Sequence, residues 1–540
     1  MIDYEKKRVL VIDDHPGMRT SIRTTLSHFG VVKTDMAMTA FEATRRIKQI
    51  PYDIIVCDYN LGEGRDGQQF LEELRHTKLI PLSTIFLMVT AERVYERVMS
   101  AAELAPDDYL IKPFTADTLH QRLNRLIEKK EAFLPTYTAM DAGNIDRAIA
   151  NCDRLVAEKP IYTVDALRLK AELLIALGKI TEAQALYEQV VAMRAVPWAR
   201  MGLAKTLFMQ DRMEDAEAEL EDLCDESPDF MAANDLLAQV QQSQGKLTDA
   251  QATLARAVAN SPNTISRQKL FGELALANGD LEKAEQAFGT VLAKGTQSIL
   301  RNPEDHARMA RVQVERGKLK EADATIGELR QHYPNDPAAE CVASVLESLK
   351  ETKAGNPTAA KQAIERALKI RAESAIGLSD NLSLDLAHGC LANGLEDTGR
   401  KLVSELVNNN HDNAPLLDKT RQLFTSLGRA EEGEQIVQEC IKNAVSMNNE
   451  AVKLARSGDL PGSVNLLIQA VENMPNNVQI LLNAAQAIMT LLRQAGWSDD
   501  RAALADVYIQ QAKQRNPDHP KLAKVNALYR DVAQKYGVTL

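Results

Sequence analysis

The chain has 540 residues, of which 45% are hydrophobic, 26% are charged and only 5% are aromatic. This length exceeds one hydrophobic core and predicts several domains or a repeat array, while the low aromatic content is more typical of stacked helices than of a sheet-rich protein. The first 130 residues carry 19 acidic and 19 basic side chains, so the net charge of −11 lies in the remainder and argues against binding to a nucleic-acid backbone.

Neither a membrane segment nor a disulfide framework is expected. No apolar run approaches the roughly 20 residues that span a bilayer. The six cysteines are far apart in the sequence and form no C-x-x-C pair. This pattern predicts isolated buried thiols and a reducing, cytoplasmic location.

Strand and helix patterns alternate along the first 130 residues. Continuous apolar runs rich in β-branched residues predict strands that are covered on both faces, and apolar stripes at helical spacing predict helices between them. The predicted strands are 8–13, 31–36, 52–58, 83–90 and 108–112, and the predicted helices are 15–29, 40–50, 67–77, 91–103 and 115–130. This alternation predicts an α/β domain with a doubly wound, five-stranded parallel sheet.

Polar side chains stand at the carboxyl ends of four predicted strands, where sites form in such a sheet. Asp13 and Asp14 end the first strand, Asp58 the third, Thr90 the fourth and Lys112 the fifth. Three carboxylates in one crevice require positive charge, and hard oxygen ligands suit Mg²⁺. The lysine supplies a second positive charge, and the threonine hydroxyl can donate to an anion.

The stretches VIDDHP, IIVCDYNL, FLMVTA and DDYLIKPF resemble the receiver domain of bacterial two-component response regulators. The resemblance covers about residues 6–130 and implies a flavodoxin-like fold. It also implies that Asp58 accepts a phosphoryl group from a histidine kinase or a phosphotransfer protein. Mg²⁺ would be held by Asp13, Asp14, Asp58 and the backbone carbonyl of Asn60.

The resemblance further implies that Thr90 and Lys112 contact the phosphoryl oxygens and that Tyr109 is the switch aromatic. The Lys112–Pro113 bond is usually cis in this family. One loop departs from the family pattern, because Gly62 replaces a proline and Gly67 lies nine rather than eight residues after the acceptor. We therefore expect a longer and looser loop after the third strand, with metal binding retained.

The rest of the chain repeats one pattern, a helix-breaking residue followed five positions later by a small residue. The spacing between units ranges from 30 to 39 residues, and a proline recurs seventeen positions after the breaker in several units. The breakers are Gly143, Gly178, Asp211 in place of glycine, Gly245, Gly279, Gly317, Gly355, Gly394, Gly428 and Gly458. The pattern predicts helix pairs in which the glycine ends helix A and the proline stops helix B.

This pattern resembles the tetratricopeptide repeat over about residues 135–515 and implies an all-α superhelical solenoid. The last helices, about 478–540, look like a degenerate unit plus a cap. The alternative is another helical solenoid or an irregular bundle. We therefore divide the chain into a receiver domain at 1–130 and a repeat domain at 131–540, joined by a short linker at about 130–136.

Repeat arrays of this kind bind proteins along the concave face that is lined by helix A. The positions ten and six residues before each helix breaker are expected to point to that face. They include Arg168, Lys205, Lys269 and Arg311, which could meet the acidic groups of a partner. The alternative is that they form simple ion pairs four residues apart on a helix surface, as in Arg168–Glu172 and Lys269–Glu273.

These features together predict a cytoplasmic response regulator whose output is a protein contact. The chain contains no P-loop, no H-E-x-x-H and no G-x-S-x-G motif, so we expect no enzymatic activity beyond intrinsic autodephosphorylation. The predicted partners are a kinase and an unidentified protein in the groove, and the resemblance also allows pairing of two receivers. The alternatives are a scaffold with an idle receiver, or a regulator of an enzyme activity carried by or bound to the repeat half.

Overall fold

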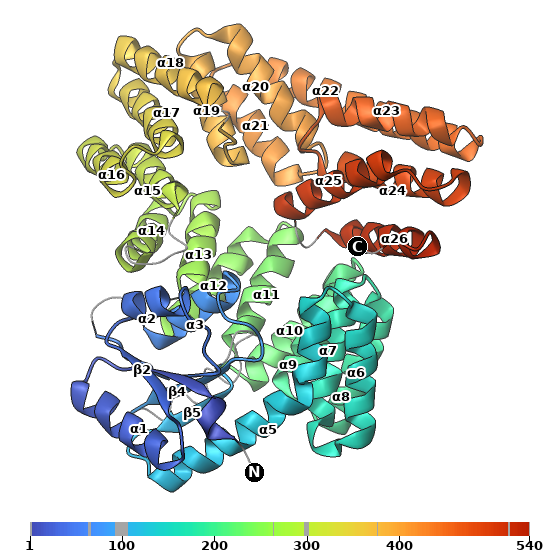
Figure 1. Cartoon of the computed structure of the whole chain (residues 1–540). Helices are drawn as coiled ribbons and strands as arrows, with labels where there is room; N and C mark the ends of the chain where they lie inside the picture. The colour runs from blue at the N-terminus through green and yellow to red at the C-terminus, as the bar shows by residue number, and fades with distance from the viewer. Residues whose placement is uncertain are drawn as a thin grey trace. The chain divides into compact units, whose positions relative to one another are not determined.

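The computed structural model describes residues 3–62, 66–91, 106–262, 264–295, 302–374, 376–516 and 519–538. The chain forms two compact units, Met1–Asp305 and His306–Leu540, and each is described by itself (Figure 1). No helix in the described parts of the chain combines the length and hydropathy needed to cross a membrane. The helix predicted over 91–103 lies outside the described residues.

The first unit begins with the predicted five-stranded parallel sheet. Its strand order is β2-β1-β3-β4-β5, with every neighbouring pair parallel. The strands are β1 (Arg8–Ile12), β2 (Lys33–Ala37), β3 (Ile54–Asp58), β4 (Ile85–Thr90) and β5 (Asp108–Ile111). Because β1 lies between β2 and β3, the strand order reverses next to β1, and a crevice opens at the carboxyl ends of the strands there.

Helices cover both faces of this sheet, as its continuous apolar strands require. Alternate strand residues such as Leu10, Ile55 and Phe86 pack towards α2 (Ala40–Ile47) and α3 (Gly67–His76). Their neighbours, such as Val9 and Val56, pack towards α1 (Pro16–His28) and α5 (Ala116–Asp141). Figure 1 shows these two layers on either side of the strands, and a 3₁₀ turn, η1 (Tyr4–Lys6), precedes β1.

The helix that closes the receiver sheet does not end at residue 130. Helix α5 runs unbroken to Asp141 with Pro135 inside it, so the prediction of a short linker at 130–136 is wrong. The second half of α5 is instead helix A of the first repeat. Phe133 is buried there against Cys152 of the next helix, α6 (Ile145–Glu158). Apolar packing on both sides of the proline outweighs its missing N–H.

Two adjacent lysines of α5 form ion pairs with different parts of the first unit, one with the repeats and one with the end of the sheet. Lys129 Nζ lies 2.7 Å from a carboxylate oxygen of Asp165 on α7 (Thr163–Ala176). Lys130 Nζ lies 2.7 Å from Asp107, which immediately precedes β5. Helix α5 is therefore attached both to the sheet and to the repeats.

The repeat helices of the first unit follow in antiparallel pairs, with a 3₁₀ turn, η2 (Pro160–Tyr162), before α7. After α7 they are α8 (Ile180–Met193), α9 (Pro197–Met209), α10 (Met213–Glu226), α11 (Met231–Ser243), α12 (Leu247–Asn260), α13 (Ile265–Ala277) and α14 (Leu281–Gly295).

The second unit continues the helical array, and the division between the units falls within its first helix. Its helices are α15 (Pro303–Glu315), α16 (Leu319–His332), α17 (Pro337–Ala354), α18 (Pro357–Glu373), α19 (Asp380–Ala392), α20 (Glu396–Asn409), α21 (Ala414–Ser426), α22 (Ala430–Arg456), α23 (Leu460–Asn473), α24 (Val478–Ala495), α25 (Asp499–Arg515) and α26 (Pro520–Lys535). Helix α22 joins helix B of one repeat to helix A of the next without a turn. This explains the short 30-residue spacing from Gly428 to Gly458.

The repeated helix breaker ends helix A, as predicted, and it has a left-handed backbone conformation. All nine glycines of that column have positive φ angles between 69° and 92°. Asp211, which replaces glycine in one unit, also adopts φ 63°. Aspartate tolerates this region better than most residues because its short side chain hydrogen-bonds locally. The small residues five positions later, such as Ala183 and Ala250, are fully buried between helices.

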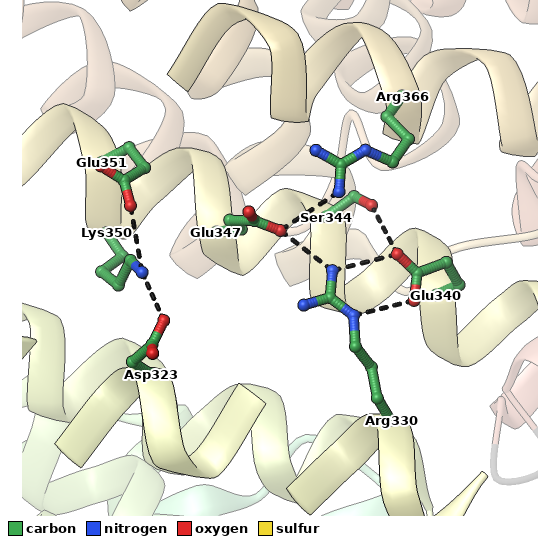
Figure 2. Close-up of polar contacts among 8 residues, drawn as sticks. All are labelled: Asp323, Arg330, Glu340, Ser344, Glu347, Lys350, Glu351 and Arg366. Carbon is green, nitrogen blue, oxygen red and sulfur yellow. Dashed lines mark hydrogen bonds and ion pairs between the residues drawn. The ribbon is translucent and has the colours of Figure 1, made fainter. Parts of the chain in front are cut away.

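In the second unit, neighbouring helices are connected by charged side chains in addition to the apolar side chains of the core (Figure 2). Arg330 of α16 makes a bidentate contact with Glu340 at 2.9 and 3.0 Å and reaches Glu347 at 2.9 Å, both on α17. Arg366 of α18 contacts the same Glu347 at 3.3 Å. These contacts raise the pKa of Arg330 and lower that of Glu340. The cluster is partly exposed, so we interpret it as an aid to helix register more than as a large source of stability.

Two glycines of the second unit provide a matched test of the packing. A Cβ at Gly433, in the small-residue column of α22, would lie 2.6 Å from the Cβ of buried Phe424, whereas a Cβ at Gly327 in α16 would meet no atom within 4 Å. We predict that Gly433→Ala destabilises the protein by about 1–3 kcal/mol through overpacking. Gly327→Ala should stabilise it by about 0.5–1 kcal/mol through helix propensity. Denaturant midpoints of the full-length variants measure both effects, and equal shifts of the same sign would contradict the packing argument.

Candidate functional site

The predicted polar residues meet at one edge of the sheet in the first unit. Asp58 ends β3 beside β4, and Lys112 donates its backbone N–H to the carbonyl of Thr90 at 2.7 Å. These residues line a cavity of about 690 Å³ together with Asp13, Asp14, Asn60 and neighbouring side chains. Asp13 and Thr90 are 1% and 2% exposed, and Asp58 is 9% exposed.

Lys112 lies between two of these carboxylates. Its Nζ atom is 3.0 Å from Asp13 Oδ2 and 3.1 Å from Asp58 Oδ2. Burial alone would lower the pKa of the lysine, but the hydrogen bonds to Asp13 and Asp58 outweigh it and raise the pKa. Burial raises the pKa of Asp58, the contact with Lys112 opposes that rise, and the nearby Asp13 and Asp14 add to it. The site therefore contains a buried carboxylate whose charge depends on adjacent cations.

The acidic pair after β1 forms a compact oxygen-rich group. Ligand atoms of Asp13, Asp14 and His15 all lie within 4.8 Å of one another. The His15 backbone N–H donates to Asp13 Oδ1 at 2.8 Å, and its ring Nδ1 lies 3.2 Å from Asp14 Oδ1. Gly62, with φ +75°, approaches so closely that a Cβ there would lie 3.3 Å from Asp14 Oδ2. Hard carboxylate donors beside an open cavity fit a Mg²⁺ ion that keeps several water ligands.

The segment after β3 brings the start of α3 against the backbone of Asp58. The Gly67 N–H donates to the Tyr59 carbonyl at 2.7 Å, and a Cβ on Gly67 would clash with the Asp58 carbonyl oxygen. Asp66 caps α3, because its Oδ1 accepts a hydrogen bond from the Gln69 backbone N–H at 2.8 Å. In turn, the Gln69 side-chain oxygen accepts one from the Asp66 backbone N–H. Glycine is therefore required at position 67 for close approach, although the spacing differs from the family pattern.

Tyr109, the predicted switch aromatic, points into the protein. Its ring belongs to the core between the sheet and α3, and burial raises the pKa of its phenol. Its buried hydroxyl has no hydrogen-bond partner among the described residues. Three residues further along the chain, the Lys112–Pro113 peptide is cis, as the family pattern implies.

The predicted groove residues are engaged within the chain. Arg168 lies 3.2 Å from Glu172 and 5.2 Å from the ring centre of Trp198. Lys205, on α9, is half-buried. The other two basic side chains of the predicted set, Lys269 and Arg311, form ion pairs with acidic residues on other parts of the chain.

In the first unit, Lys269 of α13 lies 2.8 Å from Asp305. In the second unit, Arg311 of α15 pairs with Asp385 of α19. The Arg168–Glu172 contact is the helix-surface alternative that the sequence left open. A role in partner binding remains a prediction for all four basic residues.

Several residues that line the cavity were not predicted as part of the site, and three of them carry acidic or basic side chains. Asp66 and His15 line the cavity beside the acidic pair, as does Lys294 of α14. A capping-box pattern, Asp66 followed three residues later by Gln69, could have identified the first as a helix start. No local signal could have identified Lys294, because it comes from a repeat helix far along the chain.

Comparisons with known proteins agree with this arrangement. The response regulator receiver domain family model matches residues 9–124, and tetratricopeptide repeat models match 168–229, 236–299 and 275–340. Chemotaxis protein CheY-3 of Vibrio cholerae is 31% identical over 125 residues, which are 23% of this chain and 92% of that protein. Chemotaxis protein CheY of Pseudomonas aeruginosa is 29% identical over 122 residues, 23% of this chain and 97% of that protein.

Solved structures with similar parts include both kinds of domain. The receiver domain of Francisella response regulator 1452 is 31% identical, with 23% of this chain and 98% of that chain covered and a TM-score of 0.21. A tetratricopeptide repeat protein from Parabacteroides merdae is 15% identical, with 48% and 96% covered and a TM-score of 0.31. Since the match to CheY-3 spans nearly the whole of that protein, the chain belongs to the response regulator family, with a receiver domain followed by tetratricopeptide repeats.

Proposed function

We propose that this protein is a response regulator that accepts a phosphoryl group on Asp58 from a histidine kinase or a phosphotransfer protein. The observation that supports this most directly is the position of Lys112, whose Nζ lies 3.0 Å from Asp13 and 3.1 Å from Asp58 beside an open cavity. A receiver that had lost its activity would commonly lack one of these charged groups, and this chain keeps all of them.

The residues present suit phosphoryl transfer to a carboxylate. A carboxylate oxygen of Asp58 attacks phosphorus, and the bond from phosphorus to the donor breaks, with its electron pair leaving on the donor atom. Lys112 and the Thr90 hydroxyl are placed to stabilise the transferring oxygens. Asp13, Asp14, Asp58 and the backbone carbonyl of Asn60 would hold Mg²⁺, which neutralises the charge that accumulates during transfer.

We further propose that the output of the protein is a contact with another protein, made by the repeat region in the cytoplasm. Tetratricopeptide repeats provide extended surfaces for such contacts, and the acidic composition of this region does not favour nucleic acid. The chain would then be no enzyme beyond slow loss of its own phosphoryl group. If the receiver is idle and the chain is only a scaffold, no phosphoryl donor will label it. If the repeat half carries an enzyme activity, assays of the full chain with candidate substrates will reveal it.

The acceptor role is tested by chemical labelling. With Mg²⁺ and acetyl phosphate, the full-length chain should gain one acid-stable, alkali-labile phosphoryl group, and Asp58→Asn should abolish it while leaving the circular dichroism spectrum unchanged. Asp53→Asn is the matched control, because Asp53 directly precedes the opposite end of the same strand. Equal labelling of the Asp58 variant in intact-mass spectra would remove Asp58 from this role.

The metal-binding role of the acidic pair is tested by calorimetric titration with Mg²⁺. Asp13→Asn or Asp14→Asn should weaken binding by more than about tenfold, since changes even in the outer shell of a metal site cost roughly 10–100-fold. Asp66→Asn is the control, because it removes a carboxylate from the same cavity while asparagine still caps α3. If all three variants weaken binding equally, the cavity attracts the ion by general charge and the proposed ligands are wrong.

A further inference from the structure

One side of α3 faces the repeat helices within the first unit. Gln68 is buried and its amide donates to Glu72 at 3.0 Å. Burial raises the pKa of Glu72, and Arg267 of α13 and Asp235 of α11 are close enough to act on it electrostatically. Arg267 and Asp235 are themselves joined by two hydrogen bonds of 2.7 Å. The helix that begins next to the acceptor aspartate therefore lies within reach of charged groups on the repeats.

The same repeat region contributes a cation to the acceptor cavity. Lys294, at the end of α14, lines the cavity together with Asp58, Thr90 and Lys112. Its side chain is exposed. Burial raises the pKa of Asp66 at the cavity rim, and the charge of Lys294 opposes that rise. Two lysines that are far apart in sequence, Lys112 and Lys294, thus line one anionic pocket.

Phosphorylation would change the charge balance of this pocket. A phosphoryl group adds negative charge and strong acceptor oxygens beside carboxylates that are already close together. Lys112 is already shared between Asp13 and Asp58. A second ammonium group with a long, flexible stem is suited to the outward-facing oxygens of the new group, because charge-assisted hydrogen bonds to an anion are short and strong.

We propose that Lys294 binds the phosphoryl group on Asp58, so that a repeat helix of the same chain reads the phosphorylation state directly. This inference rests on the proposed acceptor role of Asp58. It means that α14 is drawn towards the receiver when Asp58 is phosphorylated. The repeat region then senses the signal without a separate effector surface.

The test uses beryllofluoride, a phosphoryl mimic, with Mg²⁺ and the full-length chain. Lys294→Gln should weaken beryllofluoride binding about three- to tenfold by calorimetry, the range expected for one partly exposed charge-assisted contact. Lys294→Arg should retain most of the affinity. Lys283→Gln is the matched control, because Lys283 lies on the same helix but pairs with Asp280 at 2.9 Å.

Hydrogen exchange provides a second readout. Amides of α14 should gain protection with beryllofluoride in the unaltered chain and in Lys283→Gln, but not in Lys294→Gln. If beryllofluoride binds and Lys294→Gln changes neither affinity nor exchange, the inference is wrong while the acceptor role stands. Equal weakening in Lys283→Gln and Lys294→Gln would also overturn it, since only general charge would then matter. If the unaltered chain neither binds beryllofluoride nor becomes labelled, the proposed function itself fails.

Discussion

A lysine ammonium group between two buried carboxylates is the interaction around which the first unit is organised. Lys112 contacts Asp13 and Asp58, and its own backbone N–H is bound to the end of β4. Leaving a buried charge without its partner costs about 3–5 kcal/mol, so the ends of β1, β3 and β5 are held in one arrangement. The same requirement makes the site responsive, because any group that adds or removes charge there must be balanced by nearby residues.

Within the first unit, the repeats are not joined to the receiver by a flexible tether. Helix α5 completes the receiver core and is also the first helix of the repeat array. Lys129 and Lys130, adjacent in sequence, bind Asp165 on the repeat side and Asp107 on the sheet side. Since Lys294 of α14 lines the same cavity as Asp58, the repeats of the first unit meet the receiver through the shared helix and at this cavity. Allosteric coupling requires contacts that differ between two states, and a flexible linker would not supply them.

Much of this architecture follows from local sequence patterns. The carboxyl ends of parallel strands lie at one edge of the sheet. The sequence alone therefore predicted that Asp13, Asp58 and Lys112 lie close together. The glycine column predicted where helix A of each repeat ends, even where Asp211 replaces glycine. Sequence reasoning failed where distant packing decides the outcome. The closing helix was predicted to end at residue 130, yet packing around Phe133 keeps α5 continuous to Asp141. Lys269 pairs with Asp305, a partner that no spacing rule on its own helix could indicate.

The continuity of α5 also bears on how such a protein can evolve. An α-helix turns once every 3.6 residues, so one residue inserted into α5 would rotate everything beyond it by about 100° and advance it by about 1.5 Å. A flexible linker tolerates drift in length, but a shared helix does not. Insertions of about seven or eleven residues are close to a whole number of turns, so they would return the repeats to nearly their original orientation about the helix axis. Among related chains, the length of this connecting helix should therefore change by about a whole number of turns. Recombination that changes the length by other amounts would turn the first repeats away from the cavity of the receiver.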